Sequence, residues 1–430
     1  MKILRVNMNQ LKITSEKLPD EYQLVGGRGL TAKFLNEEVS PSIDPLSKEA
    51  KMIIATGPLA GTRASSLGRL SIGAKSPLTL GIKEANVGGP AGQKIDRLGF
   101  RAIIIEGAPA DSSMYYLLLS KDKISLERAD ELAGKKTYDT AAYFHKNIDK
   151  KATVFCIGLG GERRWKSAAI TFTDKDGHCS RHAARGGLGS VMGAKGLKAI
   201  VLDDRDTPAV PLKNKTVFRK AQKQFTELAK IDPQMLGMKR MGTTGVIDST
   251  RALGSMPVYN YGSEPLDGIK KINGEAIMKL REERGGAMDP CMPGCVVGCS
   301  IVFNDANGKH VTSSYEYETI ALMGTNLGIT DPDVVANFDK IIDDIGIDSI
   351  ELGSAMGVAA SAGKMKMGDS EGAYKLLDEI EKGTEFGNVL GNGVVATCKH
   401  LGVDRVPAFK GQSMPAHDAR ATKASGVTYF

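Results

Sequence analysis

Glycine is the feature of this sequence that most restricts what the chain can fold into. The chain has 50 glycines among 430 residues, about 12% where globular proteins average ~7%. They gather in phrases such as GGRG, NVGGPAG, GLGG and RGGLG, which have neither the period of collagen nor the composition of a flexible linker. Clustered glycines of this kind indicate backbone that takes positive φ or that must approach another group closely.

Between these glycine phrases, the chain up to about residue 205 consists of short apolar or alternating runs. Runs of this length with many β-branched residues predict strands. The clearest are KMIIATGPL, RAIIIEGAP, SMYYLLLS, ATVFCIGLG, SAAITFTD and KAIVLDD. Few segments hold helical spacing, and TYDTAAYFHKNI is one of them. We therefore predict that residues 1–205 form a β-rich domain.

The second half of the chain has a different pattern. A proline- and charge-rich stretch, DDRDTPAVPLKNKT (203–216), predicts a linker. Beyond it, apolar residues recur at three- and four-residue spacing, with Asp or Ser at the expected N-caps and glycine after the expected C-termini. We predict a mostly helical domain over residues 211–410. The fold class is then α+β multidomain, with a β-rich domain first and a mostly α-helical domain after it.

Charge, hydropathy and cysteine content exclude several classes of protein. The net charge of +7 is spread along the chain without a Lys/Arg run, so we expect no nucleic acid, although an acidic protein partner or an anionic cofactor is compatible. The N-terminus has no apolar leader, and no stretch approaches ~18 apolar residues, so we expect neither secretion nor a membrane span. Six cysteines in 430 residues make no disulfide framework. We expect a cytoplasmic protein.

The phrase DPCMPGCVVGCS gathers three of the six cysteines, Cys291, Cys295 and Cys299. The prolines and glycines between them oppose a regular helix and favour a loop that wraps a metal. Thiolates select zinc or iron–sulfur chemistry, and both usually need four ligands. A zinc site completed by His310 and three buried free cysteines are the alternatives that the spacing leaves open.

Two glycine-rich turns, in 84–107 and in 180–202, share a format of turn, about a dozen residues and an apolar strand. Successive backbone N–H groups in such turns form anion-binding nests, and an arginine adds a fork of donors for a phosphate. Neither turn is a dinucleotide or P-loop motif, and ordinary strand turns are the alternative. The candidate residues of the two turns are Gly88, Gly89, Arg185, Gly186 and Gly187.

Two acidic phrases admit a purely structural interpretation. SSYEYETIALMGTNLG places Glu316 and Glu318 before a helix-like run, where acidic side chains commonly offset the helix dipole. DDIGIDSIELG (343–353) can be the end of one helix followed by an N-cap at Asp348.

Taken in order along the whole chain, these phrases resemble the tungsten (and molybdenum) pterin aldehyde:ferredoxin oxidoreductase family. The part that looks like its N-terminal domain carries VGGRGL, TGPLAGT, GRLSIGAKSPLT, ANVGGPAG, LGFRAIIIEG, IGLGGE and ARGGLGSVMGAKGLKAI. The part that looks like its middle domain and the start of its third carries GTTGVIDSTRALGSMPVYNY, the cysteine phrase, YEYETIALMGTNLGI, DDIGIDSIELG and MPAHDARATKASGVTY.

The resemblance implies two pterins that hold one tungsten or molybdenum, with Mg²⁺ bridging their phosphates and a [4Fe–4S] cluster beside them. By motif, Asn86 and Ala184 match the residues whose carbonyls reach the Mg²⁺. Arg69 matches the arginine between cluster and pterin. Asp343, with Asp348 in D-x-x-G-I-D, matches a pterin-binding motif.

The three cysteines match three of the four cluster ligands, with one extra residue in the first gap. Glu318 matches the acid near the metal, a candidate for activating water or handling a proton. In the family, the fourth ligand belongs to a D-x-x-G-L-C motif of the third domain, which also carries a histidine near the metal. Residues 411–430 look like a stub of that domain. We therefore expect the fourth thiolate on a segment outside this chain, as in a truncated product or half of a split enzyme.

The function that the resemblance implies is oxidation of an aldehyde to a carboxylate, with electrons passed through the pterin-bound metal and the cluster to ferredoxin. The implied partners are ferredoxin, the aldehyde, a second copy of the chain and a separate chain that supplies the third domain. The alternative is a non-catalytic fragment or partner subunit that binds the pterin or a metal cluster. The aldehyde, and tungsten against molybdenum, stay open.

Overall fold

The structure is a computed structural model that describes residues 1–111 and 113–423. Cα packing divides the chain into two compact units. Unit 1 contains Met1–Arg164, Ala168–Asp232 and Cys291–Val296, and unit 2 contains Trp165–Ser167, Pro233–Pro290 and Val297–Phe430. Each unit therefore includes a short segment from the other half of the sequence. Residues 424–430 of the expected stub lie outside the described residues.

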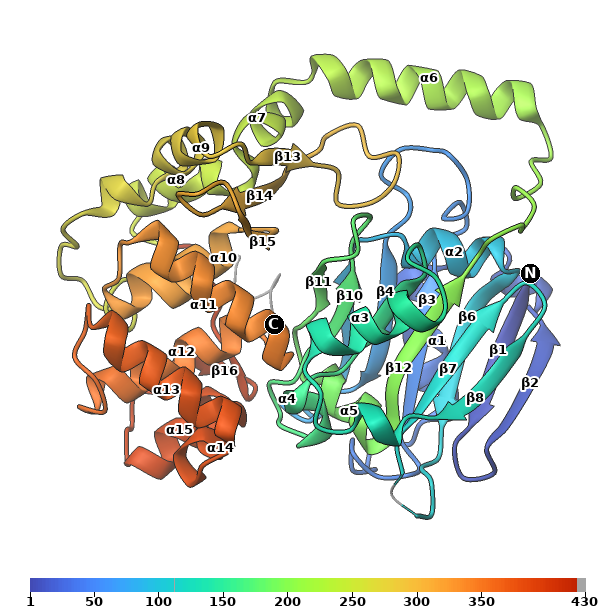
Figure 1. Ribbon diagram of the computed structural model, residues 1–430, viewed down its shortest axis with the longest axis horizontal. Helices are drawn as coiled ribbons and strands as arrows, with labels where there is room; N and C mark the ends of the chain where they lie inside the picture. Colours follow the sequence, from blue (N-terminus) through green and yellow to red (C-terminus); the bar gives the residue numbers. More distant parts are fainter. Residues whose placement is uncertain (112, 424–430) are drawn as a thin grey trace. The chain divides into compact units, whose positions relative to one another are not determined.

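Unit 1 is built on two six-stranded sheets (Figure 1). The first has the order β2-β1-β6-β3-β4-β5, in which only β1 and β6 are parallel neighbours. The second has the order β11-β10-β9-β12-β7-β8, in which β7 and β12 are parallel neighbours. The strands are β1 Lys2–Asn7, β2 Lys12–Lys17, β3 Lys51–Thr56, β4 Leu70–Lys75, β5 Ile82–Val87, β6 Phe100–Glu106, β7 Tyr115–Ser120, β8 Ile124–Arg128, β9 Thr153–Cys156, β10 Ile170–Thr173, β11 Cys179–Ala183 and β12 Leu197–Asp203.

The two sheets repeat one topology. Replacing β1 to β6 by β7 to β12 in the strand order of the first sheet reproduces the order of the second. The helices repeat as well. Helices α1 (Gly27–Glu38) and α3 (Thr137–Asn147) follow the second strand of each copy, and α2 (Ala91–Arg97) and α5 (Leu188–Ala194) follow the fifth. The two glycine-rich turns therefore occupy equivalent places, each between the fifth strand of a copy and the helix that follows it.

Strands β6, β9 and β12 are buried along nearly their whole length because both faces of each sheet are covered at its centre, whereas the edge strands β2 and β8 are largely exposed. Ile54 of the first sheet and Phe155 of the second belong to one core that lies between the sheets. Successive side chains of a strand point to opposite faces, so Ile53 packs on the outer face with residues of α1. Residues of α3 pack likewise against the outer face of the second sheet. The result is a layered unit with α1 and α3 on the outer faces, while α2 and α5 contribute residues such as Ile95 and Val191 to the core between the sheets.

Unit 2 is mostly helical, as predicted, with one small antiparallel sheet of β13 Ala287–Asp289, β14 Ser300–Asn304 and β15 His310–Ser313 and a short pair, β16 Ala408–Phe409 and β17 Gln412–Ser413. Its helices are α7 Pro233–Met241, α8 Ile247–Ala252, α9 Gly274–Glu283, α10 Tyr317–Thr319, α11 Pro332–Ile345, α12 Ser349–Ser361, α13 Ser370–Lys382, α14 Glu385–Gly391 and α15 Val394–Leu401. Helix α6 (Lys215–Ile231) belongs to unit 1, together with the short α4 (Leu159–Glu162).

The caps expected from the sequence form in the structure. Asp331, Asp348 and Asp369 each accept a backbone N–H at the start of α11, α12 and α13. Helices α11 and α13 end at Gly346 and Gly383 in the left-handed region, where glycine carries no Cβ penalty.

Helix α12 packs without any gap against the segment that follows α10. That segment is a π-helical turn, Ile320–Gly324, and then a 3₁₀ turn, Thr325–Leu327. A Cβ added at Gly353 of α12 would lie 2.7 Å from the Leu322 carbonyl oxygen, so this approach requires glycine. This contact positions the turns that follow α10 against helix α12.

The predicted α+β class, with β-rich sheets followed by helices, is confirmed. Among residues 1–111 and 113–423, every helix is too short or too polar to cross a bilayer.

We expect Gly193→Ala to lower the free energy of unfolding of unit 1 by roughly 1–3 kcal/mol. Alanine favours helix over glycine by about 1 kcal/mol, but a Cβ at Gly193 in α5 would lie 2.0 Å from the Gly161 carbonyl oxygen. Denaturant unfolding, with hydrogen exchange of the β12 amides to report on unit 1, measures the change. The matched control is Gly237→Ala in α7, where a new Cβ meets no atom within 4 Å. Equal effects at both positions would contradict the packing argument.

Candidate functional site

The first glycine turn, at 86–89, carries the cysteine loop 291–296. The Gly89 N–H donates to the Cys291 carbonyl at 2.6 Å. A Cβ at Gly88 would lie 2.9 Å from the same oxygen, and Gly89 has φ +95°. These two positions need glycine because a side chain at either one would displace the loop or strain the turn.

Further contacts hold the cysteine loop on unit 1. Gln93 Nε2 on α2 donates to the Pro293 carbonyl at 2.9 Å, and the Ser66 hydroxyl lies 3.5 Å from Cys295 Sγ. The loop 291–296 is therefore part of the β-rich unit in packing, although its sequence neighbours belong to the helical unit.

Cys291 and Cys295 form a thiol pair. A hydrogen bond with Cys295, together with burial, raises the pKa of the Cys291 thiol above its usual range, and the charges of Arg181 and Arg69 oppose this shift. Metal binding would have to displace that proton. Cys299, the third predicted ligand, belongs to unit 2, where it precedes β14.

The structure thus pairs Cys291 with Cys295 through a hydrogen bond. In the part of the chain that the structure describes, no three His, Cys, Asp or Glu side chains are grouped as a metal site. His310, the residue of the zinc alternative, lies on β15 with its Nε2 2.9 Å from Ser313 Oγ. Cys156 and Cys179 are buried in the outer core of the second sheet, and Cys398 is buried in α15.

Arg69 joins the turn and the thiols. Its Nη2 donates to the Asn86 carbonyl at 3.2 Å, and its Nε donates to the Asn86 side-chain oxygen. The positive charge of Arg69 also acts to lower the pKa of the Cys291 thiol. Arg69, Asn86, Gly88 and Cys291 therefore form one patch on unit 1.

The second glycine turn, 184–187, packs on the first sheet near the start of its edge strand β5. Gly186 and Gly187 have φ +89° and +74°. The hydroxyl of Ser76, which follows β4, donates to the Gly186 carbonyl at 2.8 Å, and a Cβ at Gly186 would lie 2.4 Å from the side chain of Lys83 at the start of β5. Ala184 and Arg185 are half-buried in the same turn. The edge strands β5 and β11 lie against each other, and one predicted turn follows each of them.

Unit 2 holds Glu318 in a separate arrangement. On α10, its Oε2 accepts the Ala416 N–H at 2.8 Å, and its Oε1 lies 3.8 Å from His417 Nε2. The Tyr317 hydroxyl donates to the Ala416 carbonyl at 2.6 Å, and its ring centroid is 5.0 Å from that of His417. Burial lowers the pKa of His417 below its ordinary value. Sequence reasoning missed His417; its only signal was its place in the phrase MPAHDAR.

The backbone around His417 is fixed on both sides. The Tyr261 hydroxyl donates to the Met414 carbonyl at 2.7 Å, and the fully buried Glu351 accepts the Ser413 N–H at 2.9 Å. The Asp418 N–H donates to the Ser255 carbonyl at 2.7 Å. His417 is thus presented to Glu318 by a segment whose main chain has little freedom.

A left-handed turn supports this segment. Tyr259, Asn260 and Tyr261 all have φ between +46° and +56°, a region that costs a non-glycine residue about 1–2 kcal/mol. Arg405 donates to the Asn260 and Tyr261 carbonyls at 2.8 and 2.7 Å, and Arg420 donates to the Tyr261 carbonyl at 2.7 Å. The strained turn persists because charged donors hold two of its three carbonyls, and the Gly262 N–H donates to the third, that of Tyr259, at 3.2 Å.

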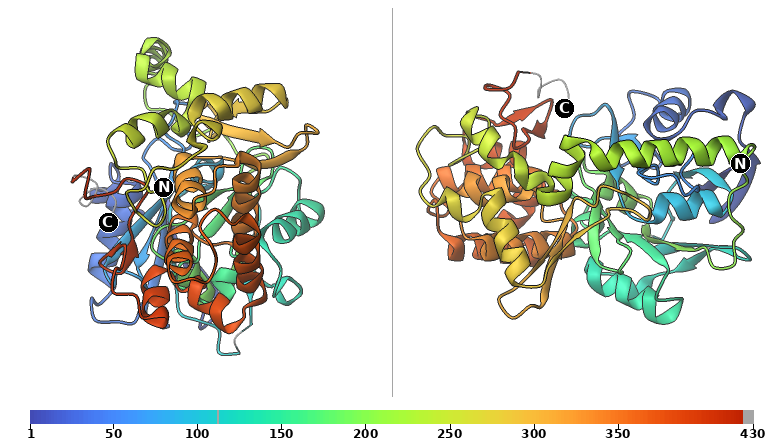
Figure 2. Two further views of the ribbon diagram at one scale, coloured as in Figure 1. Left: turned by 90° about the vertical axis from the view of Figure 1, so that its left-hand side faces the viewer. Right: turned by 90° about the horizontal axis from the view of Figure 1, so that it is seen from above.

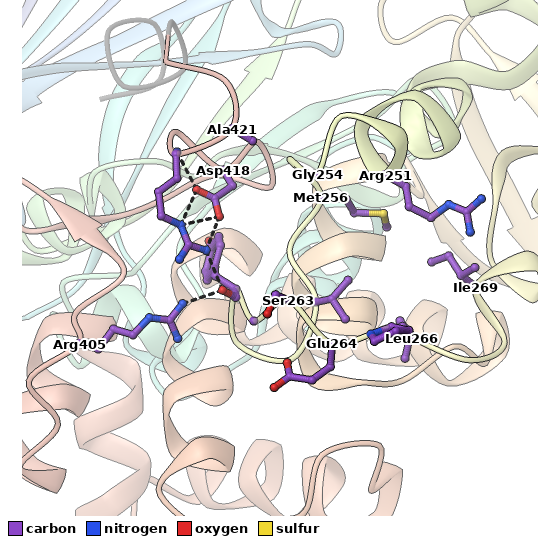
Figure 3. A pocket seen from close by; sticks show the side chains of 15 residues that line it. Arg251, Gly254, Met256, Ser263, Glu264, Leu266, Ile269, Arg405, Asp418 and Ala421 are labelled. Atoms are coloured by element: carbon purple, nitrogen blue, oxygen red, sulfur yellow. Dashed lines mark hydrogen bonds and ion pairs between the residues drawn. The ribbon is translucent and has the colours of Figure 1, made fainter.

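A pocket of about 890 Å³ opens beside this turn in unit 2. Figure 3 shows Arg405 and Asp418 on one side of it and Arg251 and Ile269 on the other. Its walls combine apolar side chains such as Met256 and Leu266 with these charges.

The D-x-x-G-I-D phrase forms the end of α11 and the start of α12. Asp343 is buried in α11 at 6% exposure, and Asp348 caps α12 by accepting the Ile350 N–H at 3.0 Å. Asp339, one turn before Asp343, is fully buried; burial and the Asp343 charge raise its pKa well above the usual range. The predicted pterin contacts of Asp343 and Asp348 remain predictions.

Comparison with known proteins identifies the relatives of this chain. The family model "Aldehyde ferredoxin oxidoreductase, N-terminal domain" matches residues 3–204, and the model of domains 2 and 3 of the same family matches residues 219–430. The tungsten-containing aldehyde ferredoxin oxidoreductase of Pyrococcus furiosus is 31% identical over 447 residues, which cover 100% of this chain and 72% of the relative. That of Thermococcus kodakarensis is 30% identical over 447 residues with the same coverage.

More distant matches widen this set. The aliphatic sulfonate oxidoreductase, WOR-like subunit, of Pyrococcus furiosus is 27% identical over 98% of this chain and 71% of its own length. Among solved structures, the active site complex BamBC of benzoyl coenzyme A reductase in complex with 1,5-dienoyl-CoA superposes with a TM-score of 0.81 at 22% identity. That match covers 97% of this chain and 66% of the other, and it concerns the fold alone.

We expect the pKa of His417 to lie below the ~6.5 of a free histidine, because burial disfavours the imidazolium. Glu318→Gln should lower it further, because a carboxylate 3.8 Å from Nε2 stabilises the charged form. Histidine NMR titration measures both values. As the pH falls, the unfolded chain protonates this histidine at a higher pH than the folded chain does. His417 should therefore destabilise the fold as the pH falls below ~6.5.

The control is Glu371→Gln, which removes an exposed carboxylate of α13. It should leave the His417 titration curve unchanged. An equal curve in wild type and Glu318→Gln would mean that the two side chains do not interact in solution.

Proposed function

Since the chain belongs to the aldehyde ferredoxin oxidoreductase family, a family of oxidoreductase enzymes, we propose that it oxidises an aldehyde to a carboxylate and passes the electrons to ferredoxin. The reaction is RCHO + H₂O → RCOO⁻ + 3 H⁺ + 2 e⁻. A water oxygen joins the carbonyl carbon, and three protons and two electrons leave. The protein must therefore orient an aldehyde, remove protons and provide a route for electrons.

The residues present fit the cofactors that the family implies. A tungsten (or molybdenum) bis-pterin would lie over the two glycine turns, with its phosphates near their N–H groups. The Asn86 and Ala184 carbonyls would face the bridging Mg²⁺, and Arg69 would lie between pterin and cluster. When bound, the pterin-held metal supplies two-electron redox chemistry and a [4Fe–4S] cluster supplies one-electron transfer. Asp343 and Asp348 would hydrogen-bond a pterin.

The observation that carries this proposal is the docking of the cysteine loop on the first glycine turn, through the 2.6 Å hydrogen bond from Gly89 to Cys291. Because the Gly89 N–H is donated to Cys291, this contact would keep a cluster on the thiol pair a short distance from a pterin held beside the turn. Arg69 contacts the turn and lowers the cost of charge on the thiols.

A [4Fe–4S] cluster usually has four cysteine ligands, and Cys291, Cys295 and Cys299 supply three. Cys156, Cys179 and Cys398 are buried in the cores of the two units. We therefore propose that the fourth thiolate comes from outside these 430 residues, on a longer form of the chain or on a separate partner chain. A second copy of the chain is also a proposed partner.

Proton removal is assigned to Glu318, as general base for the attacking water. Because burial lowers the pKa of His417, its imidazole is neutral near pH 7 and can accept a proton from the Glu318 carboxyl. Glu318 then returns to its carboxylate, and the imidazolium loses the proton to water. Direct transfer requires the 3.8 Å separation to shorten, as catalytic hydrogen bonds commonly do when substrate binds.

The function is tested by anaerobic purification, from cells supplied with tungstate, of the chain together with the segment or partner chain that supplies the fourth thiolate. Tungsten near one per chain, iron near four per chain and aldehyde-dependent reduction of a viologen dye are the expected results. An aliphatic sulfonate is the comparison substrate, because one relative carries that activity in its name. Zinc or no metal, with no dye reduction, would instead favour a non-catalytic fragment or partner subunit.

We expect Cys295→Ser to remove most of the bound iron, because a hydroxyl is a poor replacement for a thiolate ligand. Iron analysis and low-temperature electron paramagnetic resonance of the dithionite-reduced protein measure the loss. Cys398→Ser is the control, since this buried thiol of α15 should leave the iron content unchanged. Retention of iron in Cys295→Ser would place the cluster elsewhere.

A further inference from the structure

Helix α6 is an amphipathic helix that buries none of its side chains fully. It begins at Asn214, which caps it by accepting the Val217 N–H, and runs for 17 residues in unit 1 (Figures 1 and 2). Its apolar side chains Val217, Phe225, Leu228 and Ile231 are 49–72% exposed. A surface helix normally turns such residues toward a core, so four of them in contact with solvent indicate an interaction surface.

The same helix is strongly basic. Six cations against two carboxylates lie between residues 213 and 232. All of the cations are exposed: Lys213, Lys215, Arg219, Lys220, Lys223 and Lys230. Only Glu227 and Asp232 oppose them. An apolar stripe with this excess of positive charge is complementary to an acidic partner.

Contacts within unit 1 connect α6 to the cysteine loop. Gln222 Nε2 donates to the Arg63 carbonyl at 2.5 Å, and three residues further along the same loop the Ser66 hydroxyl lies 3.5 Å from Cys295 Sγ. One short loop therefore separates the helix from the thiol pair. Leu59 and Leu67 of this loop are also exposed, at 45% and 42%.

We propose that α6 and the loop 59–67, together named the acceptor face, dock a small acidic protein that carries an iron–sulfur cluster and receives electrons from the cysteine-loop site. This inference rests on the proposed function, and it adds the place where the electrons leave. Each aldehyde releases two electrons. A carrier that takes one electron must therefore dock twice per turnover, and two oxidised carriers become two reduced carriers.

Repeated docking requires a complex that forms fast and dissociates fast. Electron-transfer complexes are small, and opposite charges speed their encounter without adding much affinity. The acceptor face has these properties: a few exposed apolar side chains surrounded by cations. Its reaction with an acidic carrier should therefore slow as salt screens the charges.

Two other occupants are less consistent with the contacts. A second copy would bring two basic helices together, and like charges at an interface repel. An anionic membrane surface suits a basic amphipathic helix in general, but it gives no reason for α6 to pack on the loop that holds Cys295. The experiment described next would reveal either of these occupants.

The test compares two acceptors in the metal-loaded protein, an acidic one-cluster ferredoxin and methyl viologen. Arg219→Glu/Lys220→Glu reverses two exposed charges of α6. We expect kcat/KM for ferredoxin to fall about tenfold or more at low salt while viologen reduction stays within about twofold. Phe225→Ser should also weaken ferredoxin reduction, and high salt should bring wild type down to the charge variant.

Lys146→Glu/Lys150→Glu is the matched control, because it makes the same charge change on exposed residues at the end of α3 in the same unit. It should reduce ferredoxin as wild type does. Equal losses with both acceptors, or no loss with ferredoxin in Arg219→Glu/Lys220→Glu, would overturn the proposal. So would conversion of a dimer to a monomer by this variant, or loss of binding to phosphatidylserine vesicles with ferredoxin reduction intact.

Binding without turnover separates this inference from the proposed function. Labelled ferredoxin is titrated with each variant at low salt in the absence of aldehyde. Weaker binding by Arg219→Glu/Lys220→Glu than by the α3 control supports the acceptor face even if no aldehyde is oxidised. Equal binding by both, in a protein that does oxidise aldehydes, rejects the acceptor face and leaves the proposed function in place.

Discussion

The hydrogen bond from the Gly89 N–H to the Cys291 carbonyl is the contact on which the placement of the cysteine loop in unit 1 depends. At 2.6 Å it joins the first sheet to a segment far along the chain. It forms only because positions 88 and 89 lack side chains: a Cβ at the first would meet the Cys291 oxygen, and the second has positive φ. The nearby Arg69, the thiol pair and the loop 59–67 all take their places around this approach.

The repeated topology explains why a second turn lies close by. The two copies share a strand order, and the fifth strand of each copy is an edge strand followed by a glycine turn and a helix. Strands β5 and β11 are both edge strands and lie against each other, so each turn begins at the end of a strand where the sheets adjoin. One topology used twice therefore gives two glycine turns in equivalent places. The sequence shows this only as two phrases of like format.

Much of the fold could be predicted because its residues follow local rules. The central strands of unit 1 are apolar runs, and helices of unit 2 carry Asp caps and glycine ends. The site was harder. Its turns and cysteines are marked by glycine, proline and spacing, but the pairing of Cys291 with Cys295 while Cys299 belongs to the other unit depends on tertiary packing.

The left-handed turn at Tyr259 to Tyr261 contains no glycine, and His417 contacts Glu318 across the fold, so neither leaves a local signal. Likewise, the helical spacing of α6 predicted a helix, but periodicity cannot say which of its faces is left in solvent.

The exchange of short segments between the two units has a consequence for synthesis on the ribosome. Unit 1 receives Cys291–Val296, although its sheets are complete in sequence at β12. At ~5–20 residues per second, several seconds pass between the emergence of β12 and that of the cysteine loop. During this interval the glycine turn at 86–89 lacks the carbonyl that its N–H binds in the final fold. The segment Trp165–Ser167 is likewise synthesised long before its partner, because the Ser167 hydroxyl donates to the Gly391 carbonyl of unit 2. The nascent chain thus carries two unfinished surfaces for much of its translation, and both are completed only by segments made later.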